Sequence, residues 1–418
     1  MSLLESIHRA VDEARASRYT EMWRSLLPLG LDSGTGGYRR FAWNAADLAC
    51  REWFRAEAAA RGLDVETDRN GNLWAWWGPK GPGAVVTGSH LDSVPDGGAF
   101  DGPLGVVSSF AAIDVLRARG FAPGKPFAVA CFADEEGARF GIACAGSRLL
   151  TGALEPERAR ELRDLDGVTM AEAMERAGQD PDTLGRDDER LEGIAAYVEL
   201  HVEQGKALAF TESPVAVASA IWPHSRWRFD FGGEANHAGT TRLEDRRDPM
   251  LTYANTVLAA RKKAKLGGAV ATFGRLVVEP NGTNAIPSRV RAWLDVRAPA
   301  DDILATVTQE IIKAAGERAG RDGTAVAAER ESHTPIVEFD HGLRNLLAGR
   351  LRQSFGAVPV LPTGAGHDAG VLAAAVPTAM LYVRNPSGVS HAPGEHAEER
   401  DCLAGVTALA DVLQELAQ

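Results

Sequence analysis

Two short apolar segments, each followed by acidic residues, most constrain how this chain can fold. Residues 84–88 and 127–132 are apolar almost throughout, which predicts strands buried on both faces. A loop rich in Gly, Asp and Pro follows the first segment at 89–103, and helical periodicity follows over 104–116. Buried strands that alternate with helices predict an α/β fold with a mostly parallel, doubly wound sheet.

The pattern of the chain changes near residue 215. We expect strands at 215–221, 227–231, 269–278 and 290–296, with helices at 248–265 and 301–319. This mixture predicts a small α+β insert, ferredoxin-like in its order of elements. The α/β pattern resumes later, so we expect one domain built from 1–214 and 332–418, interrupted by a second domain at 215–331.

Composition excludes several classes of protein. The 418 residues carry a formal charge of −12, which gives no electrostatic reason to bind nucleic acid or anionic lipid. No segment reaches the roughly 18 apolar residues of a membrane helix, and the N-terminus lacks the form of a signal peptide, so we expect a cytoplasmic protein. The four cysteines form no C-x-x-C pair, which argues against a cysteine zinc site.

Residues of the types that bind metal ions follow the first predicted strand. His90 and Asp92 stand where the strand ends, and Asp101 follows in the glycine-rich loop. Ligands gather at the carboxyl ends of parallel strands, and a metal-binding histidine usually has a carboxylate partner, a role that suits Asp92. Asp101 could then bridge two metal ions. A solvated Asp-Gly turn is the alternative interpretation.

Three further positions suit the same chemistry. Glu135 and Glu136 are adjacent at the end of the second strand, and a two-metal hydrolase needs one carboxylate as ligand and another as general base. His201 lies in YVELHVEQG and His391 in NPSGVSHAPGEHA. Nitrogen and oxygen ligands of this kind suit Zn²⁺, Mn²⁺ or Co²⁺. Each residue alone also fits a charged loop or an ordinary surface or core histidine.

Together these motifs resemble the dinuclear-metal aminoacylase/carboxypeptidase peptidase family. More narrowly, EEGARFG, ELHVEQG, NHAGTT, NGTNAIPS, DVRAP and GAGHDAG resemble its hydantoinase/carbamoylase branch. That branch contains N-carbamoyl-L-amino-acid hydrolases, β-ureidopropionases and allantoate amidohydrolases. The motifs occur in family order between residues 88 and 396, so the resemblance covers nearly the whole chain.

The resemblance implies two divalent metal ions per subunit, Zn²⁺ or else Mn²⁺, Co²⁺ or Ni²⁺. One ion would be held by His90, Asp101 and His201. The other would be held by Asp101, Glu136 and His391. Glu135 would be the general base acting on a water between the ions, and Gln204 would lie close to the substrate.

The resemblance also implies that the insert is a lid and a dimerisation domain. His237 in NHAGTT would stabilise the oxyanion from across the interface of a homodimer, while Asn284 and Arg297 would bind the substrate carboxylate. A guanidinium offers a carboxylate two parallel hydrogen bonds, which supports Arg297 in this role. A loop histidine, a turn asparagine and a surface arginine are the ordinary alternatives. His367 and Asp368 would lie near the site or cap a helix.

The expected activity is hydrolysis of the carbamoyl C–N bond of an N-carbamoyl-L-amino acid or a related ureido acid, releasing ammonia and carbon dioxide. An allantoate amidohydrolase shares the same site residues and is the near alternative. An aminoacylase or dipeptidase is a more distant one, and a metal-free binding module is the alternative that is not an enzyme. The segments 221–225 and 242–245 depart from many relatives, which leaves the substrate open.

Overall fold

The computed structural model describes residues 17–418, so the N-terminal segment 1–16 lies outside the described residues. The described chain forms two compact units. Unit 1 contains residues 17–219 and Glu338–Gln418, and unit 2 contains Ala220–Val337. The division falls a few residues after each of the expected boundaries, 215 and 331. We expected Val215–Ile221 to begin the insert, but this strand pairs with Thr378–Val383, and its residues 215–219 lie in unit 1.

Unit 1 is built on a nine-stranded sheet with the order β1-β2-β4-β3-β5-β15-β6-β13, and β14 pairs with β6. The strands are β1 (Asp64–Thr67), β2 (Leu73–Trp77), β3 (Ala84–His90), β4 (Phe127–Phe132), β5 (Ile194–Val202), β6 (Val215–Ile221), β13 (Val337–Glu338), β14 (Val360–Thr363) and β15 (Thr378–Val383). The central strands β4, β3, β5 and β15 are parallel, as predicted. The pairs β1–β2, β2–β4 and β15–β6 are antiparallel, so the sheet as a whole is mixed.

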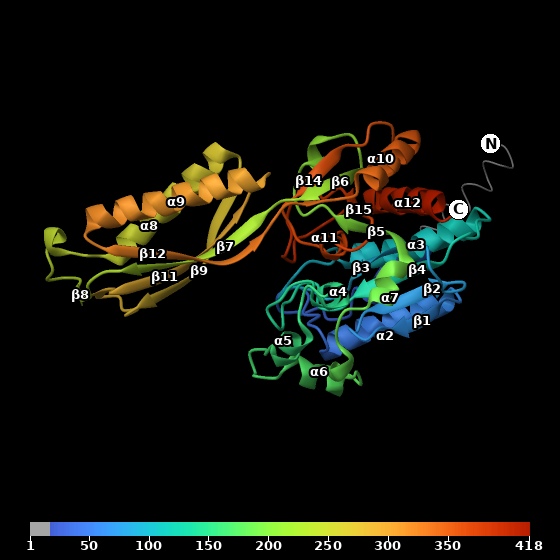
Figure 1. The fold of residues 1–418 in the computed structure, drawn as a ribbon, viewed down its shortest axis with the longest axis horizontal. Coiled ribbons are helices and arrows are strands. Elements are labelled where there is room, and N and C mark those ends of the chain that lie inside the picture. The colour runs from blue at the N-terminus through green and yellow to red at the C-terminus, as the bar shows by residue number, and fades with distance from the viewer. Residues whose placement is uncertain (1–16) are drawn as a thin grey trace. The chain divides into compact units, whose positions relative to one another are not determined.

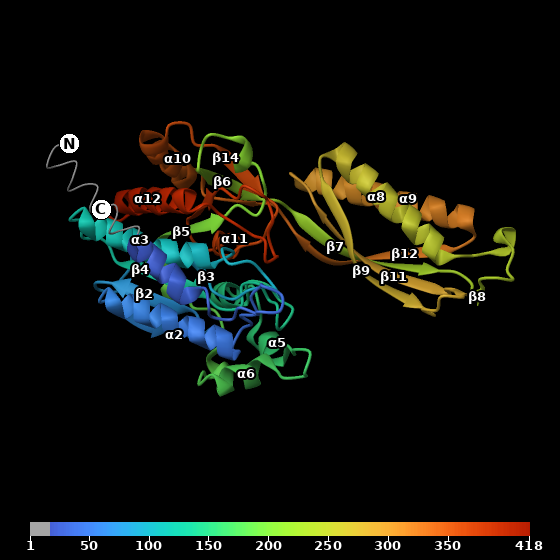
Figure 2. The same cartoon turned by 180° about the vertical axis from the view of Figure 1, so that it is seen from behind.

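Helices cover one face of this sheet with a continuous apolar core. They are α2 (Ala45–Ala60), α3 (Pro103–Ala118), α10 (His341–Phe355) and α12 (Glu399–Leu416). Helices α3 and α12 lie side by side against the sheet (Figures 1 and 2). Shorter helices complete the unit: α4 (Ala145–Thr151), α5 (Pro156–Glu161), α6 (Met170–Arg176), α7 (Asp188–Gly193) and α11 (Asp368–Leu372). None of the helices among the described residues is long and apolar enough to cross a membrane.

The side chains of β5 alternate between the helix-covered core and the opposite face of the sheet. Its even-numbered residues, Ala196 through Val202, join the helix-covered core. Successive side chains of a strand point to opposite faces, so Tyr197, Glu199 and His201 face the other side. All of these residues from 196 to 202 are buried. The strand therefore contributes to the core and directs a histidine away from it.

Unit 2 has the predicted ferredoxin-like order of elements. Its elements are β7 (His224–Gly232), α8 (Pro249–Gly267), β9 (Val270–Glu279), β11 (Arg289–Arg297), α9 (Asp301–Asp322) and β12 (Ala325–Thr334). The sheet order is β12-β7-β11-β9, and each neighbouring pair is antiparallel. Both helices lie on one face of this sheet (Figure 1). A separate two-stranded sheet joins β8 (Asn236–His237) to β10 (Ala285–Ile286).

Candidate metal centre and active site

The carboxyl ends of the parallel strands of unit 1 bring the candidate ligands together. His90 is the last residue of β3, Glu135 and Glu136 follow β4, and His201 is the penultimate residue of β5. His391 lies in the loop after β15. Because these strands are parallel neighbours, the chain segments that follow them meet at one edge of the sheet.

Asp101 stands at the centre of this cluster. Its Oδ1 lies 3.1 Å from His201 Nε2 and 3.7 Å from His90 Nε2. Its Oδ2 lies 3.3 Å from His391 Nε2, which is 3.7 Å from Glu136 Oε2. Two sets of possible ligand atoms therefore share one carboxylate: His90, Asp101 and His201 in the first, and Asp101, Glu136 and His391 in the second. These are the two sets that the family resemblance implies.

The donor atoms of the cluster fit divalent cations. Nε2 of His90, Nε2 of His201 and Oε1 of Glu136 are buried without a hydrogen-bond partner, which is costly for polar atoms unless another group binds them. Nδ1 of His90 lies 3.2 Å from the Asp92 carbonyl oxygen, and Nδ1 of His201 lies 2.9 Å from that of Val202. These contacts assign the ring proton to Nδ1 and leave each Nε2 lone pair directed at Asp101.

Asp92 has a second role that the sequence analysis did not anticipate. Besides its contact with the His90 ring, its carboxylate accepts the backbone N–H groups of Glu135 at 3.1 Å and Glu136 at 3.0 Å. One buried side chain thus fixes a candidate ligand and the backbone of the Glu-Glu pair.

The buried carboxylates and histidines of the cluster shift one another's pKa values. Burial raises the pKa of Glu135 well above its ordinary value, and burial together with Asp101 raises the pKa of Glu136 to about 7. Burial also acts to raise the pKa of Asp101, but the neighbouring imidazoles of His201 and His391 hold it well below its ordinary value. The hydrogen bond with Asp101 raises the pKa of His391 to about 9. Buried carboxylates this close together need positive charge, which protonated histidines or bound cations supply.

Two further residues hold the loops of the cluster in place. Gln204 Nε2 donates to Asp101 Oδ2 at 2.8 Å and lies 3.1 Å from His391 Nε2, so Gln204 lies in the cluster. Glu395 Oε1 accepts the N–H of Asp101 at 2.8 Å and that of Phe100 at 2.9 Å. Sequence reasoning missed Glu395, although the acidic residue in the loop after His391 was the available signal.

A group of buried polar side chains lies next to His201. The rings of His201 and His367 are 4.4 Å apart, and burial lowers the pKa of His367 well below its ordinary value. Glu199 accepts hydrogen bonds from Ser89 Oγ at 2.8 Å and from the Ala369 N–H at 2.9 Å. Asp368 accepts a hydrogen bond from Ser147 Oγ. His367 occupies the N-cap position of α11 without making a capping hydrogen bond, so helix capping does not account for it.

The remaining expected site residues are His237, Asn284 and Arg297. They belong to unit 2 and lie at two separate positions in it. Ala285, which follows Asn284, pairs with His237, and the Ala238 N–H donates to the Asn284 carbonyl at 3.0 Å. Arg297 ends β11 opposite His224, the first residue of β7. Residues 233–238 follow the other end of β7, whose nine residues span roughly 26 Å. One copy of unit 2 therefore cannot place His237 and Arg297 on the same small substrate.

The comparison with known proteins agrees with this geometry. The model for Peptidase family M20/M25/M40 matches residues 86–415. The chain belongs to the M20/M25/M40 family. Relatives include N-carbamoyl-L-amino acid amidohydrolase of Geobacillus stearothermophilus, 36% identical over 410 residues, with 95% of this chain and 98% of that protein covered. Allantoate amidohydrolase of Escherichia coli (strain K12) is 32% identical over 398 residues, with 91% and 93% covered.

Solved structures place this M20/M25/M40 chain in the hydantoinase/carbamoylase branch. An amidase of the hydantoinase/carbamoylase family from Burkholderia multivorans matches with a TM-score of 0.86 at 29% identity, covering 96% of this chain and 98% of that one. The sequence resemblance to the hydantoinase/carbamoylase branch is therefore confirmed. The relatives named above are amidohydrolases, which act on C–N bonds.

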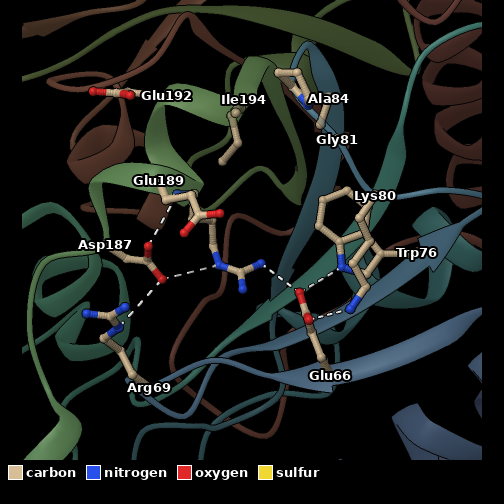
Figure 3. Close-up of a pocket in the computed structure, with 13 residues that line it drawn as sticks. Glu66, Arg69, Trp76, Lys80, Gly81, Ala84, Asp187, Glu189, Glu192 and Ile194 are labelled. Atoms are coloured by element: carbon tan, nitrogen blue, oxygen red, sulfur yellow. Dashed lines mark hydrogen bonds and ion pairs between the residues drawn. The ribbon is translucent and has the colours of Figure 1, made fainter.

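A cavity elsewhere in unit 1 is separate from the cluster. It has a volume of about 890 Å³ and is lined by Ala84 and Ile194, the first residues of β3 and β5 (Figure 3). The cluster lies at the opposite, carboxyl ends of these strands. Charged groups around the cavity pair with one another: Arg190 lies 3.0 Å from Glu66 and 3.7 Å from Asp187. The pair of Arg190 with Glu66 links β1 to α7, the helix before β5, in this M20/M25/M40 chain.

Gly102 gives a test of the cluster geometry. Its φ is +81°, and an added Cβ would lie 2.4 Å from Cε1 of His90. Gly120 has a similar φ of +72° with nothing within 4 Å of the added atom. We expect Gly102→Ala and Gly120→Ala each to lose roughly 1 kcal/mol of stability from the backbone alone. Only Gly102→Ala should also weaken binding of Zn²⁺ or Mn²⁺, by about 10- to 100-fold in a metal titration. Equal metal affinity in the two variants would contradict the placement of His90.

Proposed function

We propose that the chain is a dinuclear-metal amidohydrolase that cleaves the carbamoyl C–N bond of N-carbamoyl-L-amino acids or a related ureido acid. The observation that carries the proposal is the pair of ligand sets that share Asp101, with Glu135 beside them. A relative named N-carbamoyl-L-amino acid amidohydrolase, 36% identical along nearly its whole length, supports this substrate class. Allantoate amidohydrolases at 31% and 32% identity support the second candidate, allantoate.

The candidate ligands would hold two divalent cations, with Asp101 between them. When bound, such ions supply Lewis acidity toward a carbonyl oxygen and toward water. His391 is the exposed member of the set, with half of its side chain in solvent, so the cluster opens on that side within unit 1. His391 also has a left-handed backbone, with φ 56°, a strained conformation that is frequent at functional sites.

Glu135 is the proposed general base. Its Oε2 lies 3.6 Å from His90 Nε2 and so faces the ligand cluster, while its backbone is fixed by Asp92. The carboxylate would take a proton from the attacking water and deliver one to the leaving nitrogen. The environment supports this role, because burial favours the protonated form and makes the carboxylate a better proton acceptor.

Residues of unit 2 are proposed to complete the site. The Arg297 guanidinium would bind the substrate carboxylate, Asn284 would add a polar contact, and the His237 imidazole would donate to the developing oxyanion. Because Arg297 lies opposite the first residue of β7 while His237 follows the other end of that strand, one active site would use them from different subunits. The chain would therefore act as a homodimer.

The surface of unit 2 supports pairing with a second copy. Strand β9 is at the edge of the four-stranded sheet and exposes Leu276 and Val277. The neighbouring helix α8 exposes Leu258 and Leu266. An unpaired strand edge beside exposed leucines favours association, and the β9 strand of a second copy would extend the sheet.

The substrate class is tested by ammonia release from metal-loaded protein. We expect turnover of N-carbamoyl-L-amino acids or allantoate, and little turnover of N-acetyl-amino acids or dipeptides. Removal of metal with a chelator should abolish activity, and added Zn²⁺, Mn²⁺, Co²⁺ or Ni²⁺ should restore it with about two ions per chain. Turnover of acetylated substrates or dipeptides alone would make the protein an aminoacylase or dipeptidase. Absence of metal binding and of any turnover would favour a binding module.

The base is tested by Glu135→Gln, which removes the proton acceptor but keeps the shape of the side chain. We expect kcat to fall by about 10²- to 10⁴-fold. The metal content should be unchanged, because Glu135 belongs to neither ligand set. A variant with normal kcat would require another residue as the base.

Sharing of the site between subunits is tested by mixing inactive variants. Glu135→Gln subunits are exchanged in one mixture with His237→Ala subunits and in another with Arg297→Ala subunits. One mixture should regain about a quarter of wild-type activity, because half of randomly formed dimers are mixed and each holds one intact site. The other mixture should regain none, because its missing residue acts within its own subunit. If both mixtures or neither regain activity after exchange is verified, the shared site is wrong.

A further inference from the structure

Cys144 contacts the carboxylate of Glu135 from the side away from the ligand cluster. We propose that Cys144 is a positioning residue that holds Glu135 in its working orientation through a hydrogen bond from its thiol. This inference rests on the proposed function, in which Glu135 is the general base.

The contact divides the two carboxylate oxygens of Glu135 between two tasks. Cys144 Sγ lies 3.3 Å from Glu135 Oε1 and donates to it, and both residues are buried. Glu135 Oε2 faces His90 Nε2 at 3.6 Å. In the form that acts as the base, Glu135 is an ionised carboxylate, which only accepts hydrogen bonds, so the thiol is the donor. One oxygen is thereby held, and the other is directed at the place where water would be activated.

The backbone fixes Cys144 in position for this contact. The N–H groups of Cys144, Ala145 and Gly146 donate to the carbonyls of residues 135, 134 and 133, at 2.6, 3.0 and 2.9 Å. These three consecutive bonds join the start of α4 to the segment that follows β4. The thiol therefore has a rigid support, and its position relative to Glu135 does not depend on a flexible loop.

The conformation of Cys144 favours glycine on backbone grounds alone. Its φ of 56° lies in the left-handed region, where a side chain costs roughly 1 kcal/mol relative to glycine. Such strain is retained where a contact of the side chain compensates for it, and the Cys144 side chain contacts Glu135.

The thiol suits the surroundings of Glu135. Asp368, Glu136 and Asp92 all act to raise the pKa of Glu135, so the carboxylate lies among like charges. Burial, and then Glu135 itself, raises the pKa of the Cys144 thiol well above its ordinary value. The thiol is therefore protonated at neutral pH and serves as a neutral donor, not as a nucleophile.

Three substitutions at residue 144 test the inference. Cys144→Ala removes the donor, and Cys144→Gly removes it while relieving the left-handed strain. Both should lower kcat by about 5- to 10-fold, the loss of one hydrogen bond from a weak thiol donor, with KM and metal content unchanged. Cys144→Gly should melt no lower than Cys144→Ala. Cys144→Ser keeps a donor and should recover most of the lost kcat. A matched control is Cys131→Ala, a buried cysteine of β4 that packs in the helix-covered core and should keep its kcat.

A double substitution separates this inference from the proposed function. In the Glu135→Gln background, Cys144→Ala should have no further effect on kcat, because the group that it positions is gone. If Glu135→Gln alone keeps full activity, the assignment of the base fails. If Glu135→Gln is inactive but Cys144→Ala and Cys144→Gly both keep the wild-type kcat, the inference about Cys144 is overturned. A fall in kcat that Cys144→Ser does not recover, or equal losses in the wild-type and Glu135→Gln backgrounds, would also overturn it.

Discussion

The shared carboxylate of Asp101 is the interaction on which the rest of the site depends. Its two oxygens contact His201 on one side and His391 on the other, so a single side chain joins segments that are 190 residues apart in the chain. A carboxylate can make both contacts only if its loop is held rigidly. Glu395 provides this by accepting two backbone N–H groups of that loop, and Gly102 leaves room for the His90 ring beside it.

The Glu135–Glu136 pair is likewise held rigidly by residues around it. Asp92 accepts both backbone N–H groups, and the start of α4 donates three hydrogen bonds to residues 133–135. The side chains of the pair are thus directed by backbone contacts that lie outside the ligand sets. A metalloenzyme site needs this surrounding support, because ligand orientation determines both the affinity for the metal and the accuracy of the base. In this chain much of the support comes from buried acidic residues.

Local sequence predicted the parts of the molecule that short-range patterns specify. The apolar segments gave the parallel central strands, and the α+β pattern gave the ferredoxin-like order of unit 2. The family resemblance of the motifs also implied both ligand sets, and the structure brings the members of each set together at the ends of the parallel strands. The strand Val215–Ile221 was misplaced, since an apolar segment does not reveal which sheet it joins. Glu395 was missed because its role is a contact across almost 300 residues of sequence.

By itself, the sequence determined the class of fold, the family and the residue types of the candidate site, because these follow from periodicity and from motif spacing. Only the tertiary structure decided which atoms meet. It directed Nε2 of His201 at Asp101, placed a thiol against Glu135, and separated His237 from Arg297 by the length of a strand. The physical reason is that strand register, backbone hydrogen bonds and burial act between segments far apart in the chain, and no local pattern encodes their distances.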